Sequence, residues 1–577
     1  MATGPGGEIV AAMLAAEGVD TVFGIIDGTY FGLYSSFERH GIRLVSPRHE
    51  TTAVHMAGAY ARLTGRLGVA IASNGPGVAN ALPGVAVENG EGHRVLLITS
   101  SRRVGITHPD RGGTFQYFDQ TAVTAPMTKW SCAVPDRARI PELMRRAFRT
   151  AWSGRPGVVH VDIPESILNG KGKLEPADIR RPETYRRTAP VGADPAVVAE
   201  VAERLRVAER PVVHAGTGVV HARAFDGLRR VAEALGAPIT TSWGARGSVP
   251  ETHPLSLPMT HLDTYRSVHT ESDLVLVAGS RLGETDWWGK PPHWSSDQEV
   301  IQVDVDDHWL GVNKPLTMAV LADAGRFLDD LAAELESGPE IARRADTWSE
   351  PAKAERAELD ERLDESREAG LNPGRVARIC QEVLADDTVW VFDGGNTTVW
   401  AQFFHQARHP NSLLATFKFG MLGAGVAQAL GAQVARPDAT VCCLIGDGAM
   451  GFHPQEIETA VRNRLPVIYV VFVDLQWGMV KMNQQFSLRP VKTIIRKRLA
   501  DDETINADFS AIAYDDLARS MGAHGERVST EPELAPALER AVASGEPAVI
   551  HVDVDPVTHM WAPRLRAFKD MHAEPKG

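Results

Sequence analysis

The chain has 577 residues, which is enough for about three or four domains of average size. With 44% hydrophobic and 23% charged residues its composition is that of a globular protein, and the net charge of −13 argues against a general nucleic-acid-binding protein. No apolar run is long enough to cross a bilayer, the first residues lack a secretory signal, and four cysteines are too few for a disulfide framework, so we expect a cytoplasmic protein without a membrane or nucleic-acid partner.

The first unit, residues 1–180, alternates strand-like and helix-like patterns, which predicts a doubly wound parallel sheet. Strands are expected at 22–26, 43–46, 67–72, 95–99 and 158–163, and helices at 7–17 and 51–64. Two carboxylates follow strands: Asp27 comes directly after the first, and Glu50 lies at the start of the second helix. A carboxylate at a helix start also stabilises the helix dipole, so a structural role for Glu50 stays open.

The middle of the chain contains two connecting segments and a second unit. Residues 168–190 are polar and lack apolar periodicity, so we expect a linker there. The unit at 191–340 has expected strands at 211–214, 238–241, 274–277 and 300–303. Charge-dense residues 341–370 have helical spacing and predict a solvated linker helix.

The third unit, residues 371–556, contains two acids at equivalent places. Strands are expected at 388–392, 441–445 and 467–473, with a helix at 456–464. Asp447 follows the second strand and Asp474 follows the third. Because parallel strands end at the same edge of a sheet, we expect both acids at the edge where α/β proteins bind ligands.

Asp447 stands between Gly446 and Gly448, whose backbone amides are free to approach a ligand closely. Two carboxylates beside such amides suit Mg²⁺ carrying a diphosphate, with a backbone carbonyl at Gln476 as a further metal ligand. A Gly-Asp-Gly sequence by itself is also compatible with a simple turn.

The end of the chain is less patterned. Residues 480–506 are partly basic and weakly periodic, which predicts a long loop acting as a lid. The tail, residues 557–577, carries Trp561, Arg564 and Arg566, and we expect it to fold back over the site.

These segments resemble one enzyme family. The Gly-Asp-Gly segment with its spacing to Asp474 resembles the metal motif of thiamine-diphosphate (ThDP) enzymes, and RHETTAVHMAGAYARLTGRLGV with SNGPGVANALPGVA resembles their pyrimidine-binding domain. The order of motifs along the chain is similar to that of the acetohydroxyacid (acetolactate) synthases. The resemblance implies three α/β domains with doubly wound parallel sheets: a pyrimidine-binding domain at 1–180, a central Rossmann-like domain at 191–340 and a diphosphate- and Mg²⁺-binding domain at 371–556, followed by the tail at 557–577.

The resemblance also implies roles for four residues in catalysis. Glu50 would hydrogen-bond the aminopyrimidine and activate ThDP, and Gln116 would face the substrate pocket. His108 would assist proton transfer, and Asp27, where the synthases have glycine, would lie near the reaction centre. For Gln116 and His108, the role of an ordinary polar loop residue stays open.

Cofactor contacts are implied for residues of both outer domains, with Leu422 or its neighbour Met421 wedged under ThDP. The set is Glu50, Pro76, Asn80, Asn396, Thr397, Gly420, Met421, Leu422, Gly446, Asp447, Gly448, Ala449, Met450, Asp474, Gln476, Trp477, Gly478 and Met479. The implied metal ligands are Asp447, Asp474 and Gln476.

The implied reaction is decarboxylation of a 2-oxo acid and ligation of the acyl anion equivalent to a second carbonyl compound. A non-ligating decarboxylase or C–C lyase is the alternative, and a non-catalytic subunit of the same fold is a third reading. Because the family builds each site from two subunits, a homodimer or homotetramer is expected. Three residues differ from the family pattern. Asp474 replaces asparagine in the metal motif, and near the implied reaction centre Asp27 replaces glycine and Asn483 aligns with tryptophan.

The synthases bind FAD in the central domain. The glycine turns at 215–218 and 279–281 fit this cofactor, whereas residues 282–285 and 260–262 differ from the synthase pattern. FAD binding and a purely structural role for this domain therefore both stay open.

Overall fold

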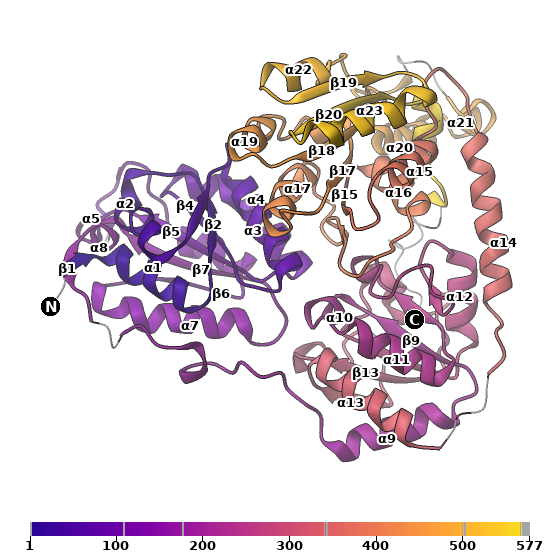
Figure 1. The fold of residues 1–577 in the computed structure, drawn as a ribbon, viewed down its shortest axis with the longest axis horizontal. Coiled ribbons are helices and arrows are strands. Elements are labelled where there is room, and N and C mark those ends of the chain that lie inside the picture. Colours follow the sequence, from indigo (N-terminus) through magenta and orange to yellow (C-terminus); the bar gives the residue numbers. More distant parts are fainter. Residues whose placement is uncertain are drawn as a thin grey trace.

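The computed structural model describes residues 3–107, 110–175, 178–339, 341, 344–498, 500, 503–565 and 567. Three six-stranded parallel sheets, each flanked by helices, follow one another along the chain (Figure 1). The predicted α/β class with three doubly wound parallel sheets is confirmed. The predicted domain boundaries stay predictions.

The N-terminal sheet has the strand order β3-β2-β4-β5-β7-β6. Its strands are β2 (Thr21–Gly24), β3 (Arg43–Val45), β4 (Gly68–Ala72), β5 (Val95–Ser101), β6 (Trp130–Ala133) and β7 (Val158–Pro164). The helices that matter for the site are α3 (Glu50–Thr64) and α4 (Pro76–Glu91). Helix α3 begins at Glu50 because the extended His49 accepts a hydrogen bond from the amide of Thr51, and it ends at the left-handed Gly65.

The central sheet has the order β11-β10-β9-β12-β13-β14. Its strands are β9 (Pro211–Ala215), β10 (Ile239–Thr241), β11 (Ser256–Leu257), β12 (Leu274–Ala278), β13 (Glu299–Asp304) and β14 (Met318–Leu321). Within the expected linker at 168–190, β8 (Lys171–Lys173) pairs with β1 (Thr3–Pro5). The expected linker helix is α14 (Ser349–Asp360), which runs along one side of the molecule in Figure 1 and buries Glu355 against the backbone of Asp263.

The C-terminal sheet has the order β16-β15-β17-β18-β20-β19. Its strands are β15 (Val389–Asp393), β16 (Leu413–Leu414), β17 (Val441–Gly446), β18 (Val467–Val473), β19 (His524–Val528) and β20 (Ala548–Asp553). Helices α16 (Gly395–Phe404), α17 (Ala424–Ala435), α18 (Asp447–Met450), α19 (Glu456–Asn463) and α24 (Pro556–Met560) complete this unit.

The prediction of a loop at 480–506 was wrong for most of its length. The chain forms α20 (Gly478–Leu488) and α21 (Pro490–Arg496). Met482 and Gln485 are both buried and stand three residues apart, so they share one face of α20. Met482 packs against Met560 and Leu565, contacts from the end of the chain that its local pattern does not reveal.

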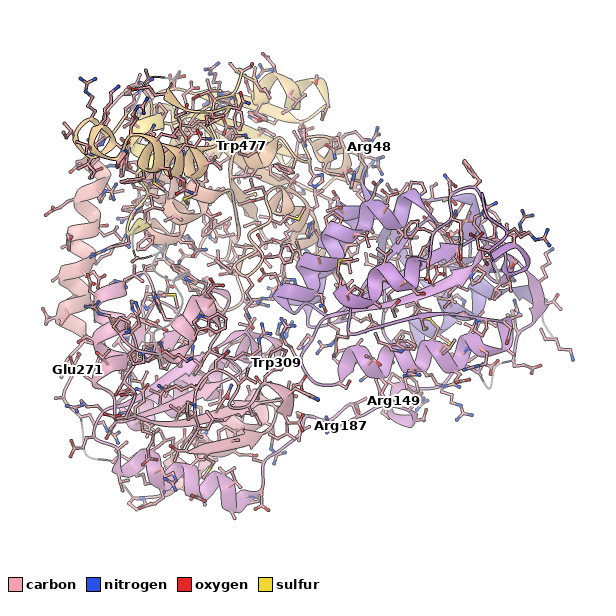
Figure 2. The ribbon with its side chains drawn as sticks, turned by 180° about the vertical axis from the view of Figure 1, so that it is seen from behind. Arg48, Arg149, Arg187, Glu271, Trp309 and Trp477 are labelled. Atoms are coloured by element: carbon pink, nitrogen blue, oxygen red, sulfur yellow. The ribbon has the colours of Figure 1, made fainter. Side chains whose placement is uncertain are left out.

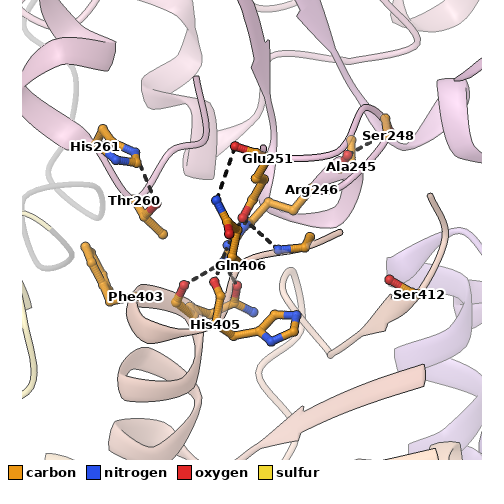
Figure 3. Close-up of polar contacts among 12 residues, drawn as sticks. Ala245, Arg246, Ser248, Glu251, Thr260, His261, Phe403, His405, Gln406 and Ser412 are labelled. Carbon is orange, nitrogen blue, oxygen red and sulfur yellow. Dashed lines mark hydrogen bonds and ion pairs between the residues drawn. The ribbon is translucent and has the colours of Figure 1, made fainter. Parts of the chain in front are cut away.

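The outer units pack directly on each other. Helix α3 lies against α17 so closely that a methyl group on Gly431 would clash with the backbone of Met56 (Figure 1). The central unit joins the C-terminal unit through Arg246 and Glu251, which contact the end of α16 (Figure 3). These contacts hold the C-terminal end of α16, the helix that begins at the predicted diphosphate loop.

Candidate active site

The two predicted metal acids lie at the ends of neighbouring strands. Strands β17 and β18 pair in parallel, and Asp447 and Asp474 follow them directly; both side chains are buried. Asp447 accepts hydrogen bonds from the amides of Gly448 at 2.7 Å and Leu475 at 2.9 Å. Burial and the adjacent Asp474 carboxylate raise the pKa of Asp447 to about 8. A divalent cation between the two carboxylates would offset this repulsion, so the pair fits Mg²⁺.

Asn396 and Thr397 occupy the first turn of α16, after Gly394 at φ +94°. Asn396 is buried, and neither Nδ2 nor Oδ1 of its amide has a hydrogen-bond partner among the described residues. An unsatisfied buried amide costs about 1–3 kcal/mol, so its presence points to a polar ligand. The helix N-terminus beside it favours an anion.

Two glycines leave room for the side chains of Asn396 and Thr397 at this loop. A methyl group on Gly478 would lie 2.6 Å from Asn396 Nδ2, and one on Gly446 would lie 2.9 Å from Thr397 Oγ1. The side chain of Met479, the residue after Gly478, lies beside Gly395. The residues present therefore fit a diphosphate held on backbone amides beside the two acids.

Other members of the predicted cofactor set direct their side chains elsewhere. Ala449 and Met450 are buried in a hydrophobic core, so only their backbone can serve a cofactor. The ring of Trp477 packs edge-on against Phe509 at 4.6 Å, beside Gly448. These aromatic rings line a cavity of about 280 Å³ next to Asp447.

Gly420, Met421 and Leu422 form the turn that leads to α17. Gly420 has φ +64°, and no atom lies near the position that a Cβ would take. Leu422 packs against a core that includes residues of α3 and α17. Asp393 holds the start of α17, because its carboxylate accepts the amide hydrogen of Gly425 at 2.7 Å.

The N-terminal unit places Glu50 beside the Gly-Pro-Gly turn. Asn80 donates a hydrogen bond to Glu50 Oε2 at 3.1 Å, and a methyl group on Gly77 would lie 3.2 Å from Oε1. Glu50 is 9% exposed, whereas Pro76 and Asn80 are exposed at the start of α4. His108 lies outside the described residues.

Asp27 and Gln116 are joined by a chain of hydrogen bonds. Asp27 accepts from the hydroxyl of Thr29 at 2.6 Å, and that hydroxyl lies 2.5 Å from Ser100 Oγ. Ser100 Oγ accepts the amide hydrogen of Asn74 at 3.0 Å, and the side chain of Asn74 donates to the carbonyl of Gln116 at 3.0 Å. The structure therefore brings these two predicted residues into one network, with Gln116 exposed and at φ +54°.

Comparisons with known proteins agree with this arrangement of three units. The chain matches models of the thiamine pyrophosphate enzyme: the N-terminal TPP binding domain over residues 5–123, the central domain over 198–331 and the C-terminal TPP binding domain over 393–552. A sulfoacetaldehyde acetyltransferase of Castellaniella defragrans is 31% identical over 562 residues, covering 93% of this chain and 90% of that protein. The chain belongs to the thiamine pyrophosphate enzyme family.

Other relatives of this ThDP enzyme are named for different reactions. A probable acetolactate synthase large subunit of Methanocaldococcus jannaschii is 28% identical, covering 96% of this chain and 92% of that protein. A 2-hydroxyacyl-CoA lyase of Oryza sativa subsp. japonica is 30% identical, covering 97% of both. The resemblance to acetolactate synthase-like ThDP enzymes is confirmed, and the chain is a ThDP-dependent enzyme of the carboligase, decarboxylase or lyase type. In the described part of the chain, no helix is long and apolar enough to cross a membrane.

The sequence reasoning missed His559 of α24, which reaches the metal acids of this ThDP enzyme. Its Nδ1 lies 2.7 Å from Asp474 Oδ2, and its Nε2 lies 3.1 Å from Thr397 Oγ1. The Asp555-Pro556 pair is a local signal for the start of α24, but it does not indicate which residues His559 contacts. Two further tail residues make other contacts: Trp561 donates to the carbonyl of Lys497, and Arg564 pairs with Asp263 on the central unit. Arg566 is outside the described residues.

A separate cavity of about 770 Å³ lies where the central unit of the ThDP enzyme meets the N-terminal unit. The two predicted glycine turns touch there, because a methyl group on Gly218 would lie 2.6 Å from Gly279 Cα. Arg281 stacks on Trp309 at 4.6 Å, and Figure 2 shows Trp309 and Arg187 at this junction. Arginines from both units line the cavity: Arg94, Arg155, Arg186, Arg187 and Arg281.

Proposed function

We propose that this ThDP enzyme uses Mg²⁺, decarboxylates a 2-oxo acid and joins the acyl group to a second carbonyl compound. The observation that carries the proposal is the buried, unsatisfied amide of Asn396 beside Asp447 and Asp474. Such an amide next to two acids fits a metal-bound diphosphate better than it fits a closed core.

The residues of the chain have distinct roles in this proposal. Asp447, Asp474 and the carbonyl of Gln476 hold Mg²⁺, and the first turn of α16 holds the diphosphate. Bound ThDP supplies a carbon nucleophile and accepts the electrons left by decarboxylation. Glu50 holds a proton at the ring nitrogen of the pyrimidine, which a carboxyl group that is buried and positioned by Asn80 can do.

We further propose that Gln116 and Asp27 face the substrate. Their shared hydrogen-bond network fixes both relative to the Gly-Pro-Gly turn. A carboxylate at Asp27 disfavours a second anion nearby, so an uncharged aldehyde or ketone is the favoured acceptor. The alternative is a non-ligating decarboxylase or a C–C lyase, as the name of the rice relative suggests.

The proposed assembly is a homodimer or homotetramer. Pro76, Asn80 and Gln116 are exposed in the single chain although they surround the predicted pyrimidine site, and Phe115 is 73% exposed. A second copy of the chain that brings its diphosphate-binding domain to this site would cover the surface. Light scattering of the purified protein tests this, and a monomer with full activity would contradict it.

FAD is proposed for the cavity of the central unit. The paired glycine turns permit close approach of a ligand, and the arginines suit its phosphates. Purified protein would then be yellow and release flavin on denaturation, whereas colourless protein that takes up no added FAD would contradict the assignment.

The reaction is tested by incubating the ThDP- and Mg²⁺-loaded protein with a panel of 2-oxo acids, alone and with aldehydes or ketoacids. Carbon dioxide release together with an acyloin product supports ligation. Aldehyde as the sole product, with every acceptor, contradicts ligation and favours the decarboxylase.

A further inference from the structure

His559 lies where the C-terminal segment reaches the predicted metal site. Strand β20 pairs with β18 so that Asp553 stands opposite Val473, and the chain after β20 therefore emerges at the same sheet edge as Asp474. Helix α24 begins there, capped by Asp555, and turns His559 inward, where it is 3% exposed.

Both ring nitrogens of His559 have partners that belong to the site. Nδ1 lies 2.7 Å from Asp474 Oδ2, and Nε2 lies 3.1 Å from Thr397 Oγ1. A carboxylate only accepts hydrogen bonds, so Nδ1 carries the proton and, in the neutral ring, Nε2 accepts the hydroxyl hydrogen of Thr397. The backbone carbonyl of His559 accepts from Trp400 Nε1 at 2.9 Å, which holds the histidine against α16.

Gln476 donates to the same oxygen of Asp474 as the histidine does. Its Nε2 lies 3.0 Å from Oδ2 and also donates to the carbonyl of Pro556 at 2.8 Å. Both donors therefore use Oδ2, and Oδ1 is the oxygen of Asp474 that is left for a cation. Hydrogen bonds of this kind orient a carboxylate that ligates a metal.

We propose that His559 is a positioning residue that orients Asp474 for Mg²⁺ and Thr397 for the diphosphate. The inference rests on the proposed function and extends it to a residue of the C-terminal segment. It also gives a reason for the aspartate at 474. An asparagine ligating through Oδ1 would turn its NH₂ group toward His559 and Gln476, so the histidine would have to change tautomer and the glutamine amide would have to flip, which would turn its oxygen toward the carbonyl of Pro556.

The test measures Mg²⁺ binding to full-length protein at saturating ThDP, by calorimetry and by tryptophan fluorescence. Replacing the partner of a metal ligand typically weakens metal affinity about 10- to 100-fold, and we expect this range for His559→Ala. His559→Asn can place its Nδ2 where Nδ1 lies and should recover most of the affinity. His559→Gln places its amide near the Nε2 position and should not.

Two controls separate positioning from packing. His405→Ala removes an equally buried histidine at the opposite end of α16 from Thr397 and should leave the Mg²⁺ affinity unchanged. Thermal unfolding of the ligand-free variants reports folding, and the Asn and Gln variants decide the question if His559→Ala does not fold.

The outcomes distinguish the two proposals. Wild-type protein that binds ThDP without any dependence on Mg²⁺, or not at all, overturns both. Wild-type protein that binds both, with all His559 variants equally tight, overturns the positioning role alone. Equal weakening in the Asn and Gln variants would also overturn it, because a role in packing does not distinguish them.

Discussion

Asn80 donates a hydrogen bond to Glu50 Oε2 at 3.1 Å, across the junction between the starts of α4 and α3. This contact fixes the orientation of the carboxylate that we propose to act on the pyrimidine of ThDP. The Gly-Pro-Gly turn and the glutamate are thus parts of one arrangement, because the turn starts the helix that carries Asn80.

Glu50→Gln should keep ThDP bound but lower turnover by about 10²- to 10⁴-fold, the usual contribution of a positioned proton-transfer group. The glutamine can still accept from Asn80, so the fold is preserved. Steady-state rates and ThDP titrations measure both effects. Glu38→Gln alters an exposed glutamate of the same unit and is the matched control. An unchanged rate would refute the role of Glu50.

Asp474→Ala removes a proposed metal ligand. Asp474→Asn keeps an oxygen that can bind the metal but turns its NH₂ group toward the hydrogen-bond donors of His559 and Gln476. We expect both to weaken Mg²⁺-dependent ThDP binding, by about 10-fold or more, with alanine the more severe. Titration of ThDP at several Mg²⁺ concentrations measures this. Full affinity in the alanine variant would mean that the metal site lies elsewhere.

Gly478→Ala should block cofactor binding without unfolding the protein. The added methyl group would lie 2.6 Å from Asn396 Nδ2, within the space proposed for the diphosphate loop. Thermal unfolding and ThDP titration separate the two effects. Gly105→Ala meets no neighbour within 4 Å and serves as the control. Normal binding in the Gly478 variant would argue against a ligand at Asn396.

Arg246→Met should destabilise the junction between the central and C-terminal units by about 3–5 kcal/mol, because it leaves Glu251 buried without its partner. The pair is 2.7 Å apart with side chains 1% and 5% exposed, and Arg246 also donates to the carbonyl of His405 (Figure 3). Denaturant unfolding measures the loss.

Arg230→Met is the control for that change, since its ion pair with Glu336 is exposed and should contribute at most about 1 kcal/mol. Adding Glu251→Gln to Arg246→Met should restore part of the stability. Equal losses for the two arginine variants would contradict the argument from burial.

Asp162→Asn should make the protein more stable at neutral pH. Burial raises the pKa of Asp162 to about 6, even though Thr99 and Gln120 donate to Oδ1. The unfolded pKa is about 3.9, so the folded state binds more protons between about pH 4 and 6 and stability falls as pH rises through this window. The predicted gain is about 2–3 kcal/mol above about pH 6 and vanishes near about pH 4. A difference in the free energy of unfolding between Asp162→Asn and the unsubstituted protein that does not vary with pH would contradict the raised pKa of Asp162.

The sequence by itself determined the three α/β units and the common edge for Asp447 and Asp474. Buried parallel strands appear as short apolar runs, and the polar residues that follow them must meet at one edge, whatever the rest of the chain does. The place of Glu50 at the start of a helix also followed from local pattern, and the structure begins that helix one residue earlier than the predicted 51–64.

Only the tertiary structure decided which side chains meet across the units. The pairing of β20 with β18 brings His559 to Asp474 although 85 residues separate them, and no local pattern encodes that contact. Helix α20 was missed for the same reason, since Met482 is buried by residues from the end of the chain. Periodicity records which face of an element is apolar, whereas the partner of that face is set by the packing of the whole fold.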